Sequence, residues 1–198
     1  MAQQKGPILL GEGAFGKVYK ETKIVNNTPR VCAVKKIENF DPAEVKEVET
    51  LMKLNHPRIV NCYGHYFEDN GRRLCIMMEF CDRGTFTKLV TESAKSPHFA
   101  ISMLFEEGNI WEFVADFSFV LEYLHTRPQP ILHRDLKPDN ILAKSSAQGL
   151  LELRLADFGL VKLMAENVQG DFYANTICGT PTYMAPEVCN CSVMFGLG

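Results

Sequence analysis

The feature of the sequence that most constrains the fold is a change of hydrophobic pattern near residue 82. Before this point, apolar residues stand in short alternating runs separated by glycines and turn residues, a pattern that predicts β-strands. We expect three antiparallel strands over residues 8–37 and two more over 59–67 and 74–80, the last two joined by a polar turn. The first part of the chain is therefore expected to form an antiparallel sheet.

Helical patterns occur once within this part and then dominate the second part. Asp41, Pro42 and Glu44 are typical of a helix start, and the spacing that follows predicts a helix from about 42 to 54. Beyond residue 82, an apolar stripe on one helical face is expected to lie in a core; it consists of Ile110, Val114, Phe117, Leu121 and Leu124. The sequence therefore predicts an α+β fold of two lobes.

Composition excludes several classes of protein. Hydrophobic residues make up 46% of the 198 residues, which predicts a folded chain and not a disordered one. No stretch approaches the roughly 20 apolar residues that cross a bilayer, and a net charge of −3 does not favour nucleic-acid binding. The N-terminus lacks the apolar core of a secretory signal, so we expect the cytosol or nucleus. The seven cysteines show no paired CxxC spacing and are expected to be reduced thiols.

The glycine-rich segment 11–16 is the first candidate for a binding site. Glycines at positions 11, 13 and 16 match a pattern that is common by chance and often marks only a turn. Here the pattern stands between two expected strands instead of between a strand and a helix, which argues against a dinucleotide-binding fold. The position favours a flexible loop whose backbone amides approach phosphates, with Val18 above a base.

The second candidate is a lysine in the third expected strand. Side chains alternate along a strand, so Ala33 and Lys35 share a face where a base and its phosphates would need a small residue and an ammonium. Lys36 points to the other face and is the second choice. On the following helix, Glu47 borders the buried stripe and needs a partner cation, for which Lys35 is the candidate.

The segment 133–140, which reads His-Arg-Asp-Leu-Lys-Pro-Asp-Asn, carries the strongest chemical signal. Its polar groups are packed between two apolar pairs and suit the transfer of a group to a hydroxyl. Asp135 accepts or orients the proton, Lys137 neutralises the moving charge, and Asn140 offers an oxygen to a divalent metal. Asp157, which follows a strand-like run and precedes a phenylalanine and a glycine, offers a second hard oxygen ligand.

In this order and spacing, the motifs resemble those of the eukaryotic protein kinase family. The resemblance covers residues 8 to about 188 and includes Ala-Val-Lys at 33–35, Asp-Phe-Gly at 157–159 and Ala-Pro-Glu at 185–187. The residues after Asp135 and those before Ala-Pro-Glu are similar to serine/threonine kinases, and other short motifs are similar to the NIMA-related group. The resemblance implies a lobe with a five-stranded antiparallel sheet and one helix, then an incomplete, mainly helical lobe.

The resemblance also implies ATP and Mg²⁺ as cofactors and a protein Ser/Thr hydroxyl as the acceptor. Asp135 would be the catalytic base and Lys137 would assist it, while Asn140 and Asp157 would hold magnesium. In the first lobe, Lys35 would hold the phosphates and pair with Glu47, which completes the catalytic set.

Further residues are assigned by the resemblance to nucleotide binding. Met78 would be the gatekeeper beside the base, and the backbone of Glu79 and Cys81 would face adenine as the hinge. The full set is Leu10, Gly11, Glu12, Gly13, Gly16, Val18, Ala33, Lys35, Lys36, Met78, Glu79, Cys81 and Leu142.

The resemblance divides the chain into three parts. Residues 1–81 would be the first lobe, 82–188 a partial second lobe with the catalytic and activation loops, and 189–198 a tail that matches nothing in the family. The family's second lobe normally continues far past this point. Two functions therefore stay open: an active serine/threonine kinase, or a catalytically silent fragment that binds a nucleotide or a partner. The protein substrate and the oligomeric state are not predicted.

The segment before the Ala-Pro-Glu motif carries an expected regulatory site. Arg134 precedes the catalytic aspartate and would attract an anionic group. In similar kinases, the threonine that corresponds to Thr176 is phosphorylated and the one that corresponds to Thr180 contacts the catalytic loop. A phosphate on Thr176 can bond the Arg134 guanidinium through two oxygens and so order the loop.

Overall fold

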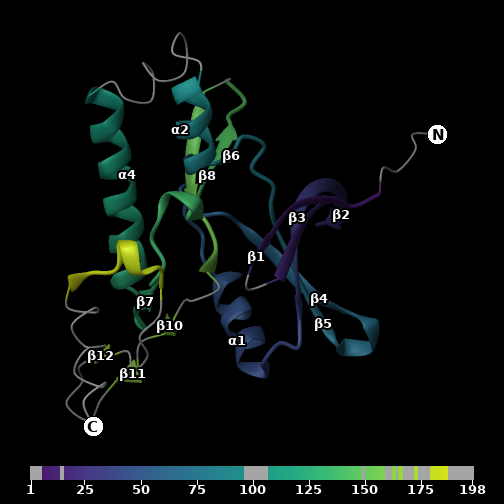
Figure 1. Cartoon of the computed structure of the whole chain (residues 1–198). Helices are drawn as coiled ribbons and strands as arrows, with labels where there is room; N and C mark the ends of the chain where they lie inside the picture. The colour runs from purple at the N-terminus through teal and green to yellow at the C-terminus, as the bar shows by residue number, and fades with distance from the viewer. Residues whose placement is uncertain are drawn as a thin grey trace. The chain divides into compact units, whose positions relative to one another are not determined.

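The computed structural model describes residues 6–13, 16–95, 107–148, 150–158, 162–163, 165–166, 172–173 and 179–186. The chain divides into two compact units, Met1–Asp82 and Arg83–Gly198. Strands β1 to β5 and helix α1 belong to the first unit, and helices α2 and α4 belong to the second (Figure 1).

The first unit is built on a five-stranded antiparallel sheet with the order β1-β2-β3-β5-β4. Its strands are β1 (Ile8–Gly13), β2 (Gly16–Val25), β3 (Thr28–Glu38), β4 (Cys62–Glu68) and β5 (Arg73–Glu79). Asn26 and Asn27 join β2 to β3 and both have positive φ, as a tight hairpin turn requires. The expected five-stranded sheet is confirmed, although β4 begins at Cys62 and not at residue 59, because Ile59 N–H donates to the carbonyl of His56 in a turn.

Helix α1 (Pro42–Leu51) follows β3 and covers one face of the sheet. A reciprocal cap holds its start, since Asp41 N–H donates to Glu44 Oε2 at 2.8 Å and Glu44 N–H donates to the Asp41 carbonyl at 2.9 Å. The helix is shorter than the expected 42–54, because the last amides bond three residues back, as Leu54 does to Leu51 at 3.0 Å.

The two faces of the sheet carry separate apolar clusters. Under α1, the buried residues Val48, Leu74 and Ile76 pack with their neighbours. On the other face the buried cluster consists of Val25, Cys32, Val34 and Cys75, and the two cysteines in it are free thiols. A bulge in β4 between Cys62 and Gly64 inserts one residue, so that Tyr63 and Tyr66 both pack against this second cluster.

The second unit combines helices with short strands. It contains β6 (Gly84–Thr85), α2 (Phe86–Lys95), α4 (Glu107–His125), β7 (Ile131–Leu132), β8 (Ile141–Ser145) and β9 (Leu151–Leu155). Three two-residue strands follow, namely β10 (Lys162–Leu163), β11 (Ala165–Glu166) and β12 (Phe172–Tyr173). The stacked rings of Phe86 and Phe113, with centroids 5.7 Å apart, join α2 to α4, which lie side by side in Figure 1.

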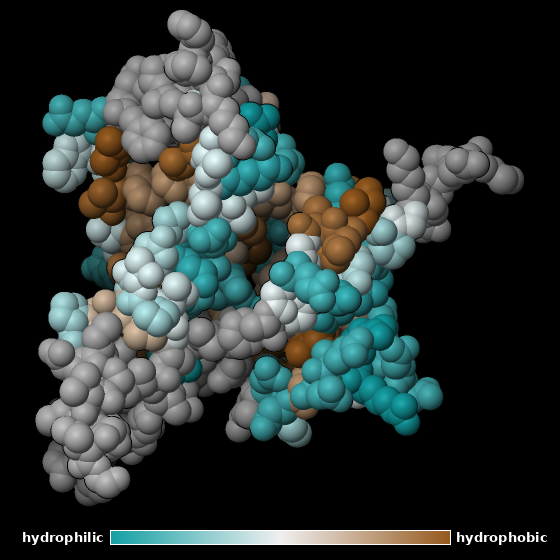
Figure 2. Space-filling view, viewed as in Figure 1, coloured by the Kyte–Doolittle hydropathy of each residue, from teal (hydrophilic) through white to brown (hydrophobic). Residues whose placement is uncertain are grey.

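The apolar stripe of α4 is only partly buried. Leu124 is fully buried near the C-terminal end, where α4 contacts β7, whereas Ile110 and Val114 are 41% and 45% exposed. Figure 2 shows hydrophobic surface along this N-terminal half of α4. The expectation that the whole stripe lies in a core is therefore wrong for this half. None of the helices in the described part of the chain has the length and apolar composition to cross a membrane.

Candidate active site

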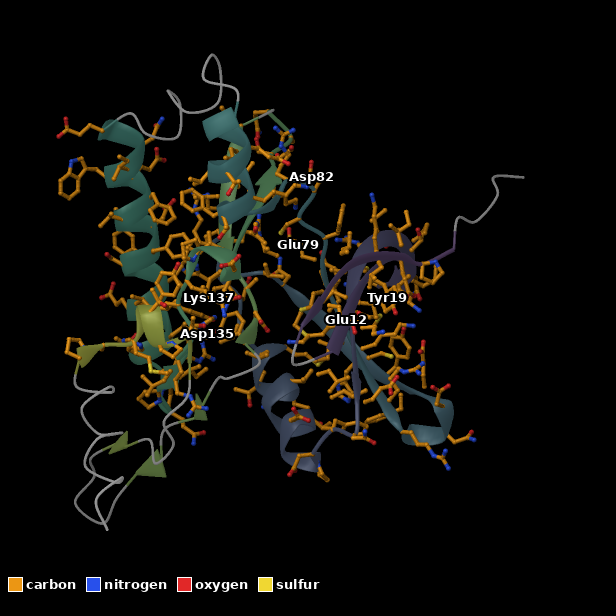
Figure 3. All side chains as sticks on the ribbon, in the orientation of Figure 1. Glu12, Tyr19, Glu79, Asp82, Asp135 and Lys137 are labelled. Carbon is orange, nitrogen blue, oxygen red and sulfur yellow. The ribbon has the colours of Figure 1, made fainter. Side chains whose placement is uncertain are left out.

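The polar segment 133–140 forms a loop between β7 and β8 in the second unit. Ile131 before the loop and Ala143 after it are buried, which anchors both of its ends. The loop closes with a single 3₁₀ turn, η2 (Pro138–Asn140), in which Asn140 N–H donates to the Lys137 carbonyl at 2.9 Å. Asp135 and Lys137 lie close together in this loop (Figure 3).

Asp135 is 6% exposed, and three side chains hold its carboxylate. Thr180 Oγ1 donates to Oδ1 at 2.6 Å, while Asn140 Nδ2 and Lys137 Nζ lie 2.9 Å and 2.7 Å from Oδ2. Lys137 Nζ also donates to Thr180 Oγ1 at 2.8 Å, which closes a ring of three side chains. Burial alone would raise the pKa of Asp135, because it disfavours the charged carboxylate. The bonds from Lys137, Thr180 and Asn140 have the larger combined effect and hold this pKa below its ordinary value. The carboxylate is therefore ionised at neutral pH.

His133 is a buried structural support of this loop. Its Nε2 lies 2.9 Å from the Ala156 carbonyl and its Nδ1 accepts the backbone N–H of Asp135 at 3.4 Å, which fits the tautomer protonated at Nε2. The ring meets Phe158 edge to face, with centroids 4.9 Å apart. Burial lowers the pKa of His133, although the Ala156 carbonyl opposes this effect, so the imidazole is neutral at pH 7.

Gly179 and Thr180 bring a distant part of the chain onto the loop. Gly179 has a φ of +123°, and a Cβ at this position would collide with the carbonyl oxygen of Arg134. Arg134 itself has a φ of +65°, in the left-handed region that few non-glycine residues adopt. Sequence analysis did not identify this requirement for glycine at position 179, because the contact with Arg134 joins segments that are far apart in the sequence.

Asn140 and Asp157 provide oxygen atoms of the kind that magnesium binds. Asn140 Nδ2 donates to both the carbonyl and Oδ2 of Asp135, at 2.8 Å and 2.9 Å, which turns the amide oxygen away from Asp135. Ala156 N–H donates to the Asn140 carbonyl at 2.8 Å, so Asp157 follows directly after a residue bonded to Asn140. An amide oxygen and a carboxylate on adjacent segments fit a hard cation that retains several waters.

In the first unit, strand pairing brings several candidate residues to one face of the sheet. Val18 lies opposite Lys35, and Ala33 lies opposite Met78. Residues directly opposite one another on antiparallel strands share a face, and Ala33 and Lys35 share one by alternation. The face that carries Val18, Ala33, Lys35 and Met78 is also the face on which α1 packs, since Met78 joins the cluster under α1.

Lys36 lies on the opposite face of β3, where two carboxylates hold it. Its Nζ is 3.0 Å from Glu68 Oε2 and 3.3 Å from Glu21 Oε1. Burial opposes the ammonium charge, but Glu68 and Glu21 outweigh burial and raise the pKa of Lys36. The structure thus separates Lys36 from the face that carries Ala33 and Lys35.

The glycine-rich segment spans the end of β1 and the start of β2, where Gly13 pairs with Gly16. Glu12 Oε1 lies 3.3 Å from Lys17 Nζ across these strands, and Figure 3 shows Glu12 beside Tyr19 of β2. Gly16 has a φ of +113°, and a Cβ there would overlap the Lys36 carbonyl oxygen. By contrast, a Cβ at Gly11 or Gly13 meets nothing within 4 Å in the described structure.

The remaining candidates lie at varied positions. Leu10 is exposed beside a bulge in β1, Cys81 is buried just after β5, and Leu142 on β8 pairs with Arg154. The backbone of Glu47 belongs to α1, but its side chain is not among those that the structure describes. Thr176 lies outside the described residues.

Comparison with known proteins places these features in a family. The sequence profile of the protein kinase domain matches residues 7–195. The chain is 35% identical over 187 residues to serine/threonine-protein kinase Nek5 of Homo sapiens, covering 91% of this chain and 24% of that protein. It is 32% identical over 185 residues to serine/threonine-protein kinase pakH of Dictyostelium discoideum, covering 91% of this chain and 32% of that protein.

A third relative is similar in the same way. The probable serine/threonine-protein kinase nek2 of Dictyostelium discoideum is 34% identical over 185 residues, which are 90% of this chain and 41% of that protein. The chain thus spans from about a quarter to two fifths of the length of these relatives. The profile match covers nearly the whole sequence, and the chain belongs to the eukaryotic serine/threonine protein kinase family.

Proposed function

We propose that this chain transfers the γ-phosphate of ATP to serine or threonine hydroxyls of a protein substrate. The observation that carries the proposal is the ring of bonds among Asp135, Lys137 and Thr180. It holds an ionised carboxylate and an ammonium 2.7 Å apart in a fixed geometry. That pair of charges suits a reaction in which a hydroxyl proton leaves while negative charge moves onto a phosphate.

In this proposal, Asp135 orients the acceptor hydroxyl and accepts its proton. The hydroxyl oxygen forms a bond to the γ-phosphorus, the bond between that phosphorus and the ADP oxygen breaks, and the proton passes to Asp135. Lys137 stabilises the charge that develops on the transferred group. Thr180 orients the carboxylate, because its hydroxyl donates to Oδ1 and occupies only one of the two lone pairs of that oxygen.

Nucleotide binding is assigned to the face of the first unit that carries Val18, Ala33, Lys35 and Met78. The small side chain of Ala33 leaves room for a flat base against this face of the sheet, and Lys35 places an ammonium two residues along the same face. Glu47 on α1 is proposed as the partner that aims Lys35. The family resemblance supports a further contribution from the backbone of Glu79 and Cys81 to base recognition.

Asn140 and Asp157 are the residues proposed to hold magnesium. When bound, Mg²⁺ neutralises charge on the phosphates of the nucleotide. Asp135 keeps the Asn140 amide in one orientation by accepting two bonds from Nδ2, so the amide oxygen is directed away from Asp135 and can serve as a ligand.

Regulation is proposed at Thr176, through a phosphate that binds Arg134. The geometry that supports a coupling is the close approach of Gly179 to the Arg134 carbonyl, which joins the segment after Thr176 to the catalytic loop. If Thr176→Ala and Arg134→Ala reduce activity independently, so that their effects multiply in the double variant, this coupling does not exist.

We also propose the division into a first lobe at 1–81, a partial second lobe at 82–188 and a tail at 189–198, with a location in the cytosol or nucleus. The acceptor residue is the direct test of the kinase type. The purified chain is incubated with γ-labelled ATP, Mg²⁺ and a peptide library, and the labelled amino acids are identified. Label on serine and threonine supports the proposal, whereas label confined to tyrosine contradicts it.

A further inference from the structure

The proposed chemistry does not use the buried carboxylate of Glu79. This residue ends β5 and is 4% exposed, in a strand where Leu74, Cys75 and Ile76 are buried apolar residues. Because Glu79 lies opposite Cys32, its side chain is on the face away from Ala33 and Lys35. A buried carboxylate lowers stability unless donors satisfy it, so its donors indicate what it does.

Asn61 supplies two donors, both to the same carboxylate oxygen. Its backbone N–H and its Nδ2 both donate to Glu79 Oε2 at 3.3 Å, and Glu79 N–H donates to the Asn61 carbonyl at 2.9 Å. Asn61 directly precedes β4, so these bonds join the end of one strand to the start of its neighbour. We call this three-bond contact the Asn61–Glu79 clasp.

A second contact supports the segment that leaves the sheet. Lys20 Nζ lies 4.4 Å from the centre of the Phe80 ring. Lys20 lies opposite Ala33, on the face away from the Glu79 carboxylate. The segment is therefore held from β4 by the clasp and from β2 by Lys20. Figure 3 shows Glu79 at the end of β5 and Asp82 farther along the same segment.

We infer that the Asn61–Glu79 clasp positions the backbone of residues 79–81 and thereby sets the preference for adenine over guanine nucleotides. The inference rests on the proposed function, in which this backbone bonds the base. Backbone N–H and C=O groups cannot rotate independently to suit a different base. Discrimination between adenine and guanine therefore depends on the position of the backbone at the end of β5, to within about 0.5 Å. A purine with the wrong donor and acceptor pattern then leaves polar groups unpaired. Asn61 and Glu79 are positioning residues in this scheme.

The test is to disturb the clasp and then restore it with exchanged groups. Asn61→Asp sets two carboxylates against each other, whereas Asn61→Asp combined with Glu79→Gln restores the bond between the two side chains with donor and acceptor exchanged. The backbone N–H of residue 61 loses its acceptor in the double variant, because Glu79 Oε2 accepts from both groups in the wild type. Dissociation constants of Mg·ATP and Mg·GTP are measured by calorimetry on the full chain, together with thermal melts. We expect Asn61→Asp to weaken ATP binding about tenfold and GTP binding less than about twofold. The double variant should recover part of the ATP preference that Asn61→Asp loses, because the repulsion between the two carboxylates is removed.

The outcomes separate this inference from the proposed function. Equal weakening of both nucleotides in a folded Asn61→Asp variant, or no recovery in the double variant, overturns the clasp's role and leaves the kinase proposal intact. A wild-type chain that binds neither nucleotide overturns both. If Asn61→Asp fails to fold, the isosteric Glu79→Gln variant tests the role of the clasp, because this substitution weakens the clasp without adding charge. We expect it to reduce the ATP preference about threefold, and an unchanged ratio refutes the inference.

Discussion

Thr180 Oγ1 donates a 2.6 Å hydrogen bond to Asp135 Oδ1, although 45 residues separate them in the sequence. The same hydroxyl accepts a bond from Lys137 Nζ at 2.8 Å. The segment that precedes the Ala-Pro-Glu motif therefore contributes a side chain to the proposed catalytic group. The position of this segment and the geometry of Asp135 depend on each other.

Replacing Thr180 tests this relationship. Thr180→Ala removes one donor to Asp135 and an acceptor from Lys137, so we expect kcat to fall about 10- to 100-fold. Thr180→Ser retains the hydroxyl and should keep kcat within a few-fold of the wild type. Both are measured by steady-state phosphotransfer at saturating ATP. Wild-type kcat in Thr180→Ala would show that the bond plays no part in the reaction.

The close approach of Gly16 to the Lys36 carbonyl predicts a difference between glycines of the same loop. Gly16→Ala introduces a collision and a disfavoured φ, so we expect a loss of about 1–3 kcal/mol in the free energy of unfolding. Gly13→Ala is the matched control, because its Cβ meets open space, and should change stability by less than about 0.5 kcal/mol. Urea denaturation of both variants measures the difference, and equal values would contradict the geometry of this loop.

The two faces of β3 predict opposite results for its adjacent lysines. Lys35→Met should abolish phosphotransfer with little loss of stability, because the ammonium is proposed to bind phosphates. Lys36→Met should lower the melting temperature, since it leaves Glu21 and Glu68 without their shared cation, at a cost on the order of 1–2 kcal/mol. Activity assays and thermal melts are compared for both. If Lys35→Met were active and Lys36→Met inactive, Lys36 and not Lys35 would be the lysine that binds the phosphates.

Burial of His133 predicts a dependence of stability on pH. Its pKa is lowered in the folded state, mainly by burial, so below about pH 6.5 the unfolded chain binds a proton that the folded chain does not. The stability contributed by neutral His133 is complete above that pH and declines as the pH falls toward the lowered pKa. Between pH 7 and 5, the wild type should lose stability more steeply than His133→Phe in urea titrations. Parallel pH profiles for the two proteins would be inconsistent with a buried neutral imidazole.

Features that depend on residues close together in the sequence could be predicted from the sequence alone. Asp135, Lys137 and Asn140 lie within six positions, so their shared loop could be predicted from one segment. Strand alternation likewise separated Lys35 from Lys36, because the period of two is a local property of the backbone.

Contacts between distant segments were harder to predict. The approach of Gly16 to Lys36 and the bonds between Asn61 and Glu79 arise from strand pairing, which a hydrophobic pattern does not specify to the residue. The exposed half of α4 shows the same limit, since periodicity identifies an apolar face without identifying what covers it.

The most direct measurement of the proposed function compares the wild type with Asp135→Asn in phosphotransfer from γ-labelled ATP, with ATP binding measured on the same samples. The substitution keeps the size of the side chain and removes the proton acceptor. We predict that transfer falls at least about 100-fold while the dissociation constant of ATP changes less than about threefold. Equal transfer by the two proteins, or none by a wild type that binds ATP, would contradict the assignment of Asp135 as the base of a phosphotransfer reaction.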